Sequence, residues 1–322
     1  MKKIISIMMA ITLLVGIAGC GKSTTATTTN ESASTNSEQQ VVKIAYLPIT
    51  HALPIFVENE LQSQTNSNIK IELVKYGSWP ELMDALNTGR VDGASVLIEL
   101  ALKAKEQGID LKAVALGHKD GNAVVVSKDI NRVEDLKGKS FAIPHKQSSH
   151  NILLHQMLEN AGLTETDIKI VELAPSEMPA ALANNQISGY CVAEPFGAKS
   201  VQLGNGKALF QSGELWKDSI CCALVLNNDF IKNKKDAAKS LVTQYNKAGK
   251  YITENKSVAN EIAKKYMKVD DAVLDISMNW ISYNDLKITK DAYTDLTTRV
   301  KKLGLSENPP TYDDFVDSSL LE

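Results

Sequence analysis

The chain has 322 residues, of which 43% are hydrophobic, and its formal net charge is −3 at pH 7. This length allows one large domain or two medium-sized domains. Acidic and basic residues are mixed along the chain, which excludes a basic nucleic-acid-binding surface. After Cys20, no apolar run is long enough to span a membrane.

The first residues are typical of an export signal. Two lysines precede an apolar run, Ile4 to Ala18, which is shorter than the roughly 20 residues of a membrane-spanning helix. The run leads through small residues to Cys20 and resembles a bacterial lipobox, in which that cysteine is acylated. Two or three acyl chains make a stable anchor. We predict a signal peptide at residues 1–19 and a lipidated Cys20 at the outer face of the cell membrane; the alternative is an ordinary signal peptide with a chance cysteine.

Residues 20–40 should form a flexible linker. Beyond the cysteine they are small and polar, so they cannot bury enough apolar surface to fold. Residues 16–23 match the phosphate-loop pattern G-x-x-x-x-G-K-[ST], but a working loop follows a buried strand and opens a helix. This match follows a signal segment, and we reject it.

From Val41, short apolar runs alternate with stretches of helical periodicity. The run Ser78-Trp79-Pro80-Glu81 has the form of a capping box at a helix start, and Gly89 ends that helix. In chain order, the predicted strands of the first half are 41–47, 69–75, 91–96, 111–116 and 123–127. The predicted helices between them begin near His51, Ser78 and Leu97.

The pattern restarts after Lys139. The predicted strands are 140–144, 168–173, 189–193 and 221–226, and the predicted helices are 149–161, 178–184 and 198–204. Beyond Asp229 the chain reads as helical to its end. Strand–helix alternation favours parallel βαβ units. We therefore predict a bilobal α/β protein with two open sheets flanked by helices and a helical C-terminal region; a single doubly wound domain is the alternative.

Ligands of open parallel sheets bind beyond the carboxyl ends of the strands. The loops at these ends carry hydroxyl side chains that we place at helix N-caps, where free amides attract small anions. These candidate ligand residues are Thr50, Ser78, Ser95, Ser148 and Ser149. Ordinary helix capping is the competing interpretation.

Histidines are the second group of candidates. Four of the five, His51, His118, His145 and His150, fall in loops that we place on the cleft side. His150 and His155 lie about 140° apart on a helix, so they cannot serve one site, and we expect His155 to face solvent. Converging histidines bind zinc or donate to anions. As an alternative function we name a metal site of His51, His145 and His150; ordinary surface or capping histidines remain an open alternative.

Other residues have less specific roles. Trp79 and Phe196 are candidate walls of a ligand pocket or simply core residues, and Glu194 is a candidate hinge or ligand residue. The cysteines Cys191, Cys221 and Cys222 are interpreted as buried thiols, although one extracellular disulfide involving Cys191 stays open. Motifs of catalytic serine, zinc-protease or dinucleotide sites are missing after the signal region, so we predict no enzyme activity and no cofactor.

Several segments are similar to the nitrate/sulfonate/taurine/bicarbonate-type periplasmic binding proteins of ABC importers. The similarity covers residues 41 to about 268 and includes the lipobox. Its motifs are Ser78–Leu82, Gly89–Ala94, Ala193–Gly197 and Trp216–Cys222.

The resemblance implies a type II periplasmic-binding-protein fold that closes on its ligand and docks on an ABC permease with a cytoplasmic ATPase. The implied ligand is a small anion or organic solute, such as nitrate, bicarbonate, a sulfonate or a thiamine-pyrimidine precursor. Residues 41–127 and 222–322 would form the first lobe and residues 128–221 the second, in a monomer. A biosynthetic protein of the pyrimidine pathway and a sensory or adhesion lipoprotein are the remaining alternatives.

Overall fold

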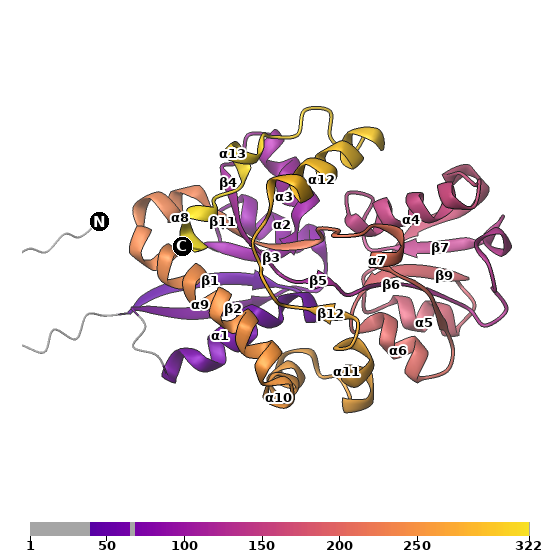
Figure 1. Cartoon of the computed structure of the whole chain (residues 1–322), viewed down its shortest axis with the longest axis horizontal. Helices are drawn as coiled ribbons and strands as arrows, with labels where there is room; N and C mark the ends of the chain where they lie inside the picture. The colour runs from indigo at the N-terminus through magenta and orange to yellow at the C-terminus, as the bar shows by residue number, and fades with distance from the viewer. Residues whose placement is uncertain (1–38, 65–67, 322) are drawn as a thin grey trace, which may run out of the picture. The chain divides into compact units, whose positions relative to one another are not determined.

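Strand β1 (Gln40–Tyr46) opens the folded region with alternating burial that becomes complete at its end. The computed structural model describes residues 39–64 and 68–321. The signal peptide expected at 1–19, Cys20 and nearly all of the linker therefore lie outside the described residues. The described part of the chain belongs to one compact unit that contains two five-stranded sheets (Figure 1).

The first sheet is mixed rather than purely parallel. β1 pairs in parallel with β2 and β3, whereas β11 is inserted antiparallel between β3 and β4. Its strands, in spatial order, are β2 (Ile69–Lys75), β1, β3 (Gly93–Leu97), β11 (Cys222–Asn227) and β4 (Leu111–Leu116). The central strands β3 and β11 are buried along almost their whole length, as apolar runs in a covered sheet should be.

The second sheet repeats this arrangement. β7 pairs in parallel with β8 and β9, and β6 lies antiparallel between β9 and β10. Its strands, in spatial order, are β10 (Lys207–Gln211), β6 (Asn122–Val126), β9 (Gly189–Ala193), β7 (Ser140–Ile143) and β8 (Lys169–Glu172). A separate two-stranded pair joins β5 (Lys119–Asp120) to β12 (Ile281–Ser282).

The chain crosses from the first sheet to the second before β6. The predicted first lobe runs to residue 127, but β6 belongs to the second sheet, and β11 belongs to the first sheet. The chain therefore crosses before Asn122 rather than after Ser127. It returns through the segment that contains α7 (Ser212–Leu215), and the two crossing segments meet where Ser212 Oγ lies 3.5 Å from Asp120 Oδ1.

Helices flank both sheets, and α9 packs on α1 and α10 (Figure 1). The helices that follow the strands are η1 (Thr50–Ala52), α1 (Leu53–Leu61), α2 (Trp79–Asn87), α3 (Ile98–Glu106), α4 (Ser149–Asn160), α5 (Met178–Ala183) and α6 (Phe196–Gln202). The C-terminal helices are α8 (Asn228–Asn233), α9 (Lys235–Glu254), α10 (Lys256–Met267), α11 (Asp271–Ser277), α12 (Lys290–Lys302) and α13 (Tyr312–Phe315). Of the helices in the described ranges, none is both long and apolar enough to cross a bilayer.

The predicted helix caps at Thr50 and Ser95 are wrong, and Ile49 rather than Thr50 is the N-cap of η1. Ser95 lies inside β3 opposite Leu224, because the strand runs on to Leu97 and the next helix begins only at Ile98. Ser78 is the N-cap of α2 as predicted, but its side chain makes no capping hydrogen bond. Ser148 is a true cap, since its hydroxyl accepts a hydrogen bond from the Asn151 amide at 3.2 Å.

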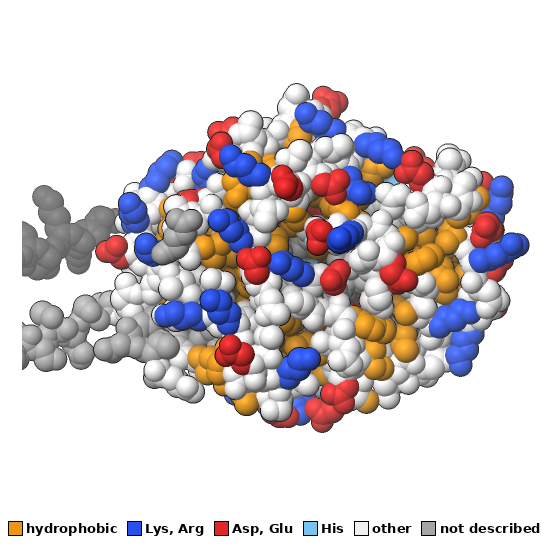
Figure 2. Space-filling view, viewed as in Figure 1, with side chains coloured by type: hydrophobic (Ala, Val, Ile, Leu, Met, Phe, Trp, Pro, Cys, Tyr) orange, Lys and Arg blue, Asp and Glu red, His pale blue; other side chains and the backbone are white. Residues whose placement is uncertain are grey.

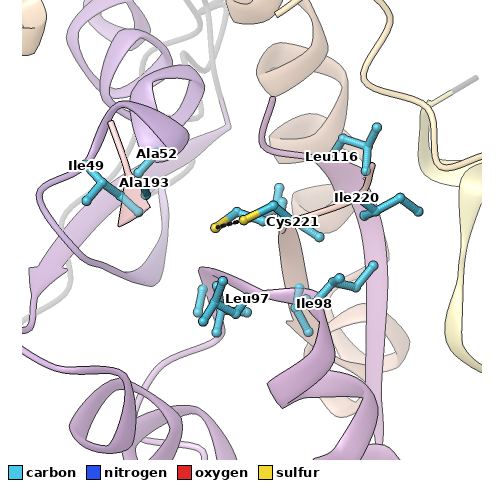
Figure 3. Packing of buried hydrophobic residues seen from close by; sticks show 14 of the residues in the cluster. Ile49, Ala52, Leu97, Ile98, Leu116, Ala193, Ile220 and Cys221 are labelled. Carbon is cyan, nitrogen blue, oxygen red and sulfur yellow. Dashed lines mark hydrogen bonds between the residues drawn. The ribbon is translucent and has the colours of Figure 1, made fainter. Parts of the chain in front are cut away.

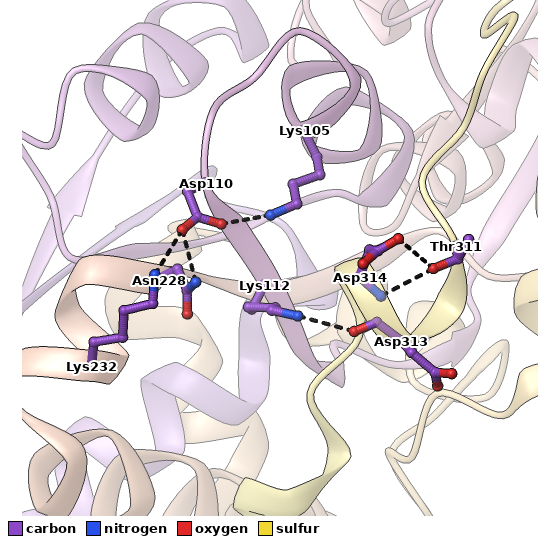
Figure 4. A network of polar contacts seen from close by, with 8 residues as sticks. All are labelled: Lys105, Asp110, Lys112, Asn228, Lys232, Thr311, Asp313 and Asp314. Carbon is purple, nitrogen blue, oxygen red and sulfur yellow. Dashed lines mark hydrogen bonds and ion pairs between the residues drawn. The ribbon is translucent and has the colours of Figure 1, made fainter.

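The C-terminal segment covers the exposed edge of β4. Lys112 Nζ donates to the carbonyl of Asp313 at 3.1 Å, and Ala113 forms an isolated parallel bridge with Val316 (Figure 4). At the start of β4, Asp110 accepts hydrogen bonds from Lys105 and Asn228 (Figure 4). Covering an edge strand in this way removes a template for unwanted pairing. Elsewhere, charges of both signs alternate over the face in Figure 2, in keeping with the small net charge.

Candidate metal centre

Three segments bring metal-ligating side chains to one edge of the first sheet. His51 lies in η1 just after β1, and His118 follows the end of β4. Because β11 runs antiparallel to β4 and Ala223 pairs with Leu116, the first residues of β11 lie beside the last residues of β4. Cys221 and Cys222 are therefore carried to the two histidines.

The four side chains form a tight, buried cluster. One ligand atom each from His51, His118, Cys221 and Cys222 lies within 4.8 Å of all the others, and every side chain is buried. Cys221 Sγ is 3.7 Å from His51 Nδ1 and 3.9 Å from Cys222 Sγ. Figure 3 shows the Cys221 sulfur, joined by a dashed line to the second sulfur, between Ile49 on one side and Leu116 on the other.

Backbone carbonyls orient both imidazoles. His51 Nε2 lies 2.8 Å from the carbonyl oxygen of Gly121, so this nitrogen carries the proton and Nδ1 presents its lone pair toward Cys221. His118 Nδ1 lies 2.6 Å from the carbonyl oxygen of Asp120, which leaves its Nε2 as the acceptor, and the Cys222 amide donates to this nitrogen at 3.4 Å. In a metal site, the histidine ring nitrogen that does not bind the metal usually donates a hydrogen bond to a group such as a backbone carbonyl, and this bond orients the ring.

The spacing of these atoms suits a tetrahedral metal ion. Zinc–sulfur and zinc–nitrogen bonds of about 2.3 and 2.0 Å at tetrahedral angles place sulfur about 3.5 Å from nitrogen and about 3.8 Å from a second sulfur. The corresponding separations here are 3.7 Å between Cys221 Sγ and His51 Nδ1, and 3.9 Å between the two sulfurs. Thiolate with imidazole is a donor set that selects zinc or copper over magnesium and calcium.

Close backbone packing holds the two histidines together. The His51 and His118 rings stack with centroids 3.5 Å apart and planes inclined by 30°. Gly117 allows the two segments to approach, since a Cβ at this position would lie 2.6 Å from the His51 carbonyl oxygen. A larger residue there would push the two segments apart.

The two thiols are electrostatically unequal. Burial by itself raises the pKa of Cys221, but a hydrogen bond with Cys222 and the nearby His51 and His150 rings outweigh it and hold that pKa well below its usual value. Burial and the adjacent Cys221 sulfur raise the pKa of Cys222 well above its usual value. Cys221 is therefore the thiolate of the pair, and a thiolate is the form that binds metal.

Two buried carboxyls lie close to the proposed ligand region. Burial and the Cys221 sulfur raise the pKa of Glu99, and neither of its oxygens has a hydrogen-bond partner among the described residues. Burial also raises the pKa of Glu194 to about 8. The Glu194 carbonyl oxygen accepts hydrogen bonds from both the amide and the hydroxyl of Thr50, each at 2.9 Å, and so joins the second sheet to η1.

The structure brings together some of the predicted ligand residues. His51 and His118 are in the cluster, and His150 is fully buried and interacts electrostatically with Cys221. His145 is not one of the clustered residues; it is half-buried, and its Nδ1 accepts a hydrogen bond from the Gln147 amide at 2.9 Å.

The remaining predicted residues occupy different surroundings. Ser148 and Ser149 begin α4 next to His150, whereas Ser78 and the fully buried Trp79 begin α2. Phe196 is half-buried and lines a separate pocket of about 100 Å³ between α6 and the loop before α11.

Sequence reasoning missed the two candidate sulfur ligands. Cys221 and Cys222 were interpreted as buried thiols, and all three described cysteines are indeed buried and free. A pair of adjacent cysteines at the start of an apolar strand was the available signal. Its meaning depends on β11 lying beside β4, which the local sequence does not specify.

Comparisons with known proteins agree with this fold. The NMT1-like family matches residues 35–267. The ligand-binding component of an ABC-type import system from Staphylococcus aureus, solved with zinc bound, is 43% identical and has a TM-score of 0.84; the match covers 88% of this chain and 98% of that one. The periplasmic nitrate-binding protein NrtA from Synechocystis PCC 6803 is 20% identical with a TM-score of 0.77, over 88% and 87% of the two chains. The expected periplasmic-binding-protein fold is confirmed.

Curated relatives are more distant. The nitrate/nitrite binding protein NrtA of Nostoc is 24% identical over 77% of this chain, but the match covers only 63% of the length of that protein. The chain thus spans less than two thirds of this relative, and 29% of the nitrate import ATP-binding protein NrtC of Synechocystis. The resemblance stated from the sequence motifs is confirmed at the level of the family.

Proposed function

Because the chain belongs to the NMT1-like family, we propose that it is the ligand-binding component of an ABC importer and that its ligand is a zinc ion. Family membership agrees with the prediction of a binding protein rather than an enzyme. His51, His118 and Cys221 hold the ion, with one further donor. The observation that carries the proposal is the set of buried ligand atoms that lie within 4.8 Å of one another. The zinc bound to the similar S. aureus component supports the choice of metal.

A small oxyanion suits the same place less well. The relatives named for nitrate favour an anion as the second candidate. An anion beside these histidines would meet the Cys221 thiolate, whose pKa is held well below its usual value. Like charges in a buried site repel strongly, because little water screens them. A divalent cation is stabilised by the same thiolate.

The arrangement of two separate sheets supports a transport mechanism in which the protein closes on its ligand. We infer two lobes, one around each sheet, that close on the ion and present the closed form to a permease with its ATPase. The ion biases this equilibrium only by its extra affinity for the closed form. In this proposal Cys20 carries the lipid anchor, and the protein works as a monomer at the outer face of the membrane.

Metal analysis of the purified protein tests the proposal directly. We expect about one zinc ion per chain, measured by inductively coupled plasma mass spectrometry, and loss of that zinc in Cys221→Ser. Cys191→Ala is the matched control, since Cys191 is an equally buried cysteine outside the cluster. Ligand loss should weaken binding by more than the roughly 10- to 100-fold that mutations of supporting residues cause.

The same protein preparation distinguishes the second candidate. In thermal unfolding, zinc should raise the melting temperature of the metal-free protein, and nitrate, bicarbonate and alkyl sulfonates should not. Zinc-independent stabilisation by one of these anions, together with no bound zinc, would show that the ligand is an anion.

A further inference from the structure

The segment at residues 120–122, where the chain crosses between the sheets, also supports the candidate metal ligands. The carbonyl oxygens of Asp120 and Gly121 lie 2.6 Å from His118 Nδ1 and 2.8 Å from His51 Nε2, respectively. Both residues have positive φ, 58° for the aspartate and 79° for the glycine. A left-handed aspartate is costly, and residues in such conformations cluster at binding sites. This turn directs two consecutive carbonyls toward two different imidazoles.

The next residue, Asn122, reaches the cluster with its side chain. It is the first residue of β6 and pairs with Ala193 in the second sheet. Its Oδ1 lies 3.7 Å from Cys221 Sγ, and the residue is only 1% exposed. The amide nitrogen Nδ2 is buried too and has no hydrogen-bond partner within residues 39–64 and 68–321. A buried amide donor without a partner is costly, so its position needs a reason.

The Cys221 sulfur faces two acceptors at once. Its thiol proton can be donated to Asn122 Oδ1 or to His51 Nδ1, each 3.7 Å away, but not to both. When a metal ion binds, the S–H bond breaks, the proton passes to water, and a metal–sulfur bond forms. The amide oxygen of Asn122 would then face a negatively charged sulfur, which is unfavourable where little water screens the charge.

Rotation of the Asn122 amide removes this conflict. A half-turn about its Cβ–Cγ bond exchanges Oδ1 with Nδ2 and leaves the shape of the side chain unchanged. Nδ2 then donates a hydrogen bond to the thiolate, and such a charge-assisted bond is roughly twice as strong as a neutral one. The same rotation gives the unpartnered amide donor a partner.

We propose that Asn122 is a positioning residue of the metal centre and donates an N–H···S hydrogen bond to the metal-bound Cys221 thiolate. This inference rests on the proposed function and names a residue of the second sheet that supports a ligand at the edge of the first. The hydrogen bond withdraws electron density from the sulfur and stabilises the buried thiolate, while the metal is bound by other groups. Supporting residues of this kind change metal affinity by roughly 10- to 100-fold.

Cobalt substitution in Asn122→Leu tests the hydrogen bond. Leucine has nearly the shape of asparagine but no donor, so we expect cobalt and zinc to bind roughly 10- to 100-fold more weakly. The thiolate-to-cobalt charge-transfer band should move to longer wavelength, because a thiolate without this hydrogen bond gives up an electron more easily. Asn227→Leu is the matched control, since Asn227 ends the strand that Cys222 begins and its amide donates to backbone carbonyls. This control should be less stable but keep the wild-type band and affinity.

A measurement on the wild type does not depend on the folding of any variant. In isotope-labelled protein loaded with NMR-active cadmium, the metal should show a scalar coupling to a proton of a primary amide, because such couplings pass through N–H···S hydrogen bonds. Absence of this coupling, no band shift in Asn122→Leu, or an equal shift in both variants would overturn the role of Asn122 and leave the zinc proposal intact. No binding of cobalt, cadmium or zinc by the wild type would instead overturn the proposed function itself.

Discussion

Acidification of the metal-free protein from pH 7 to pH 5 should lower its stability through His118 and His150. Burial lowers the pKa of each ring to about 4, whereas a histidine in an unfolded chain titrates near its usual value of about 6.5. Between these values the unfolded chain binds more protons than the folded protein, so the free energy of unfolding falls as the pH falls. For one such histidine the loss between pH 7 and pH 5 is about 2 kcal/mol.

The variant His150→Gln isolates one of the two titrations. Glutamine is uncharged at both pH values, so the pH-dependent loss in this variant should be smaller than in the wild type by about 2 kcal/mol. Urea unfolding in the presence of EDTA, followed by the fluorescence of the three tryptophans, measures both losses. The chelator is essential because zinc binding to the folded protein is itself pH-dependent and would conceal the effect.

His155→Gln is the matched control for this experiment. His155 lies on the same helix but is only half-buried, beside Glu165 at 3.5 Å, and its titration should change less on folding. If His150→Gln and the wild type lose the same stability between pH 7 and pH 5, the ring of His150 is not held neutral by burial. The placement of that ring in a dry cluster would then be refuted.

Three further predictions concern the surroundings of the site and the edges of the fold. Gly117→Ala should lower stability by about 1–3 kcal/mol and weaken zinc binding, because the new Cβ would meet the His51 carbonyl oxygen at 2.6 Å; unchanged unfolding and zinc titrations would contradict this. Asp110→Asn should lower the free energy of unfolding by about 0.5–1 kcal/mol at pH 7. The hydrogen bond from Lys105 lowers the pKa of Asp110. The difference in unfolding free energy between wild type and variant should therefore shrink as the pH falls below about 4. A difference that does not change with pH would contradict this role of the Asp110 carboxylate. Glu58→Gln should stabilise the protein at pH 7 by about 1 kcal/mol or more, because burial raises the pKa of Glu58 well above its usual value. The free energy of unfolding of the wild type therefore falls as the pH rises above about 4.5. Chemical unfolding should give the two proteins equal unfolding free energies near pH 4.

Many elements could be predicted from local patterns. The strands β2, β4 and β9 have the predicted bounds, because each is a short apolar run ended by turn residues. β10 was missed, since its residues are only half-buried at the edge of the second sheet and give no strong apolar signal. An edge strand forms because it pairs with a strand elsewhere in the chain, and the local sequence does not show which strand that is.

The assignment of β6 to the first lobe differs from its place in the second sheet. β6 looks like the natural continuation of the first sheet, but it pairs with β9 and β10 in the second. β11 follows the elements of the second sheet in sequence and returns to the centre of the first. Both placements depend on contacts between residues far apart along the chain, which hydrophobic periodicity does not encode.

By itself, the sequence determined the alternation of strands and helices, the family resemblance and the concentration of histidines in loops. These properties are local, because periodicity, turn residues and motifs are read within a few residues. Only the tertiary structure decided which histidines share a site and that Cys221 and Cys222 join them. The physical reason is that this centre exists only where β11 pairs with β4 and Gly117 lets the chain pass close to His51.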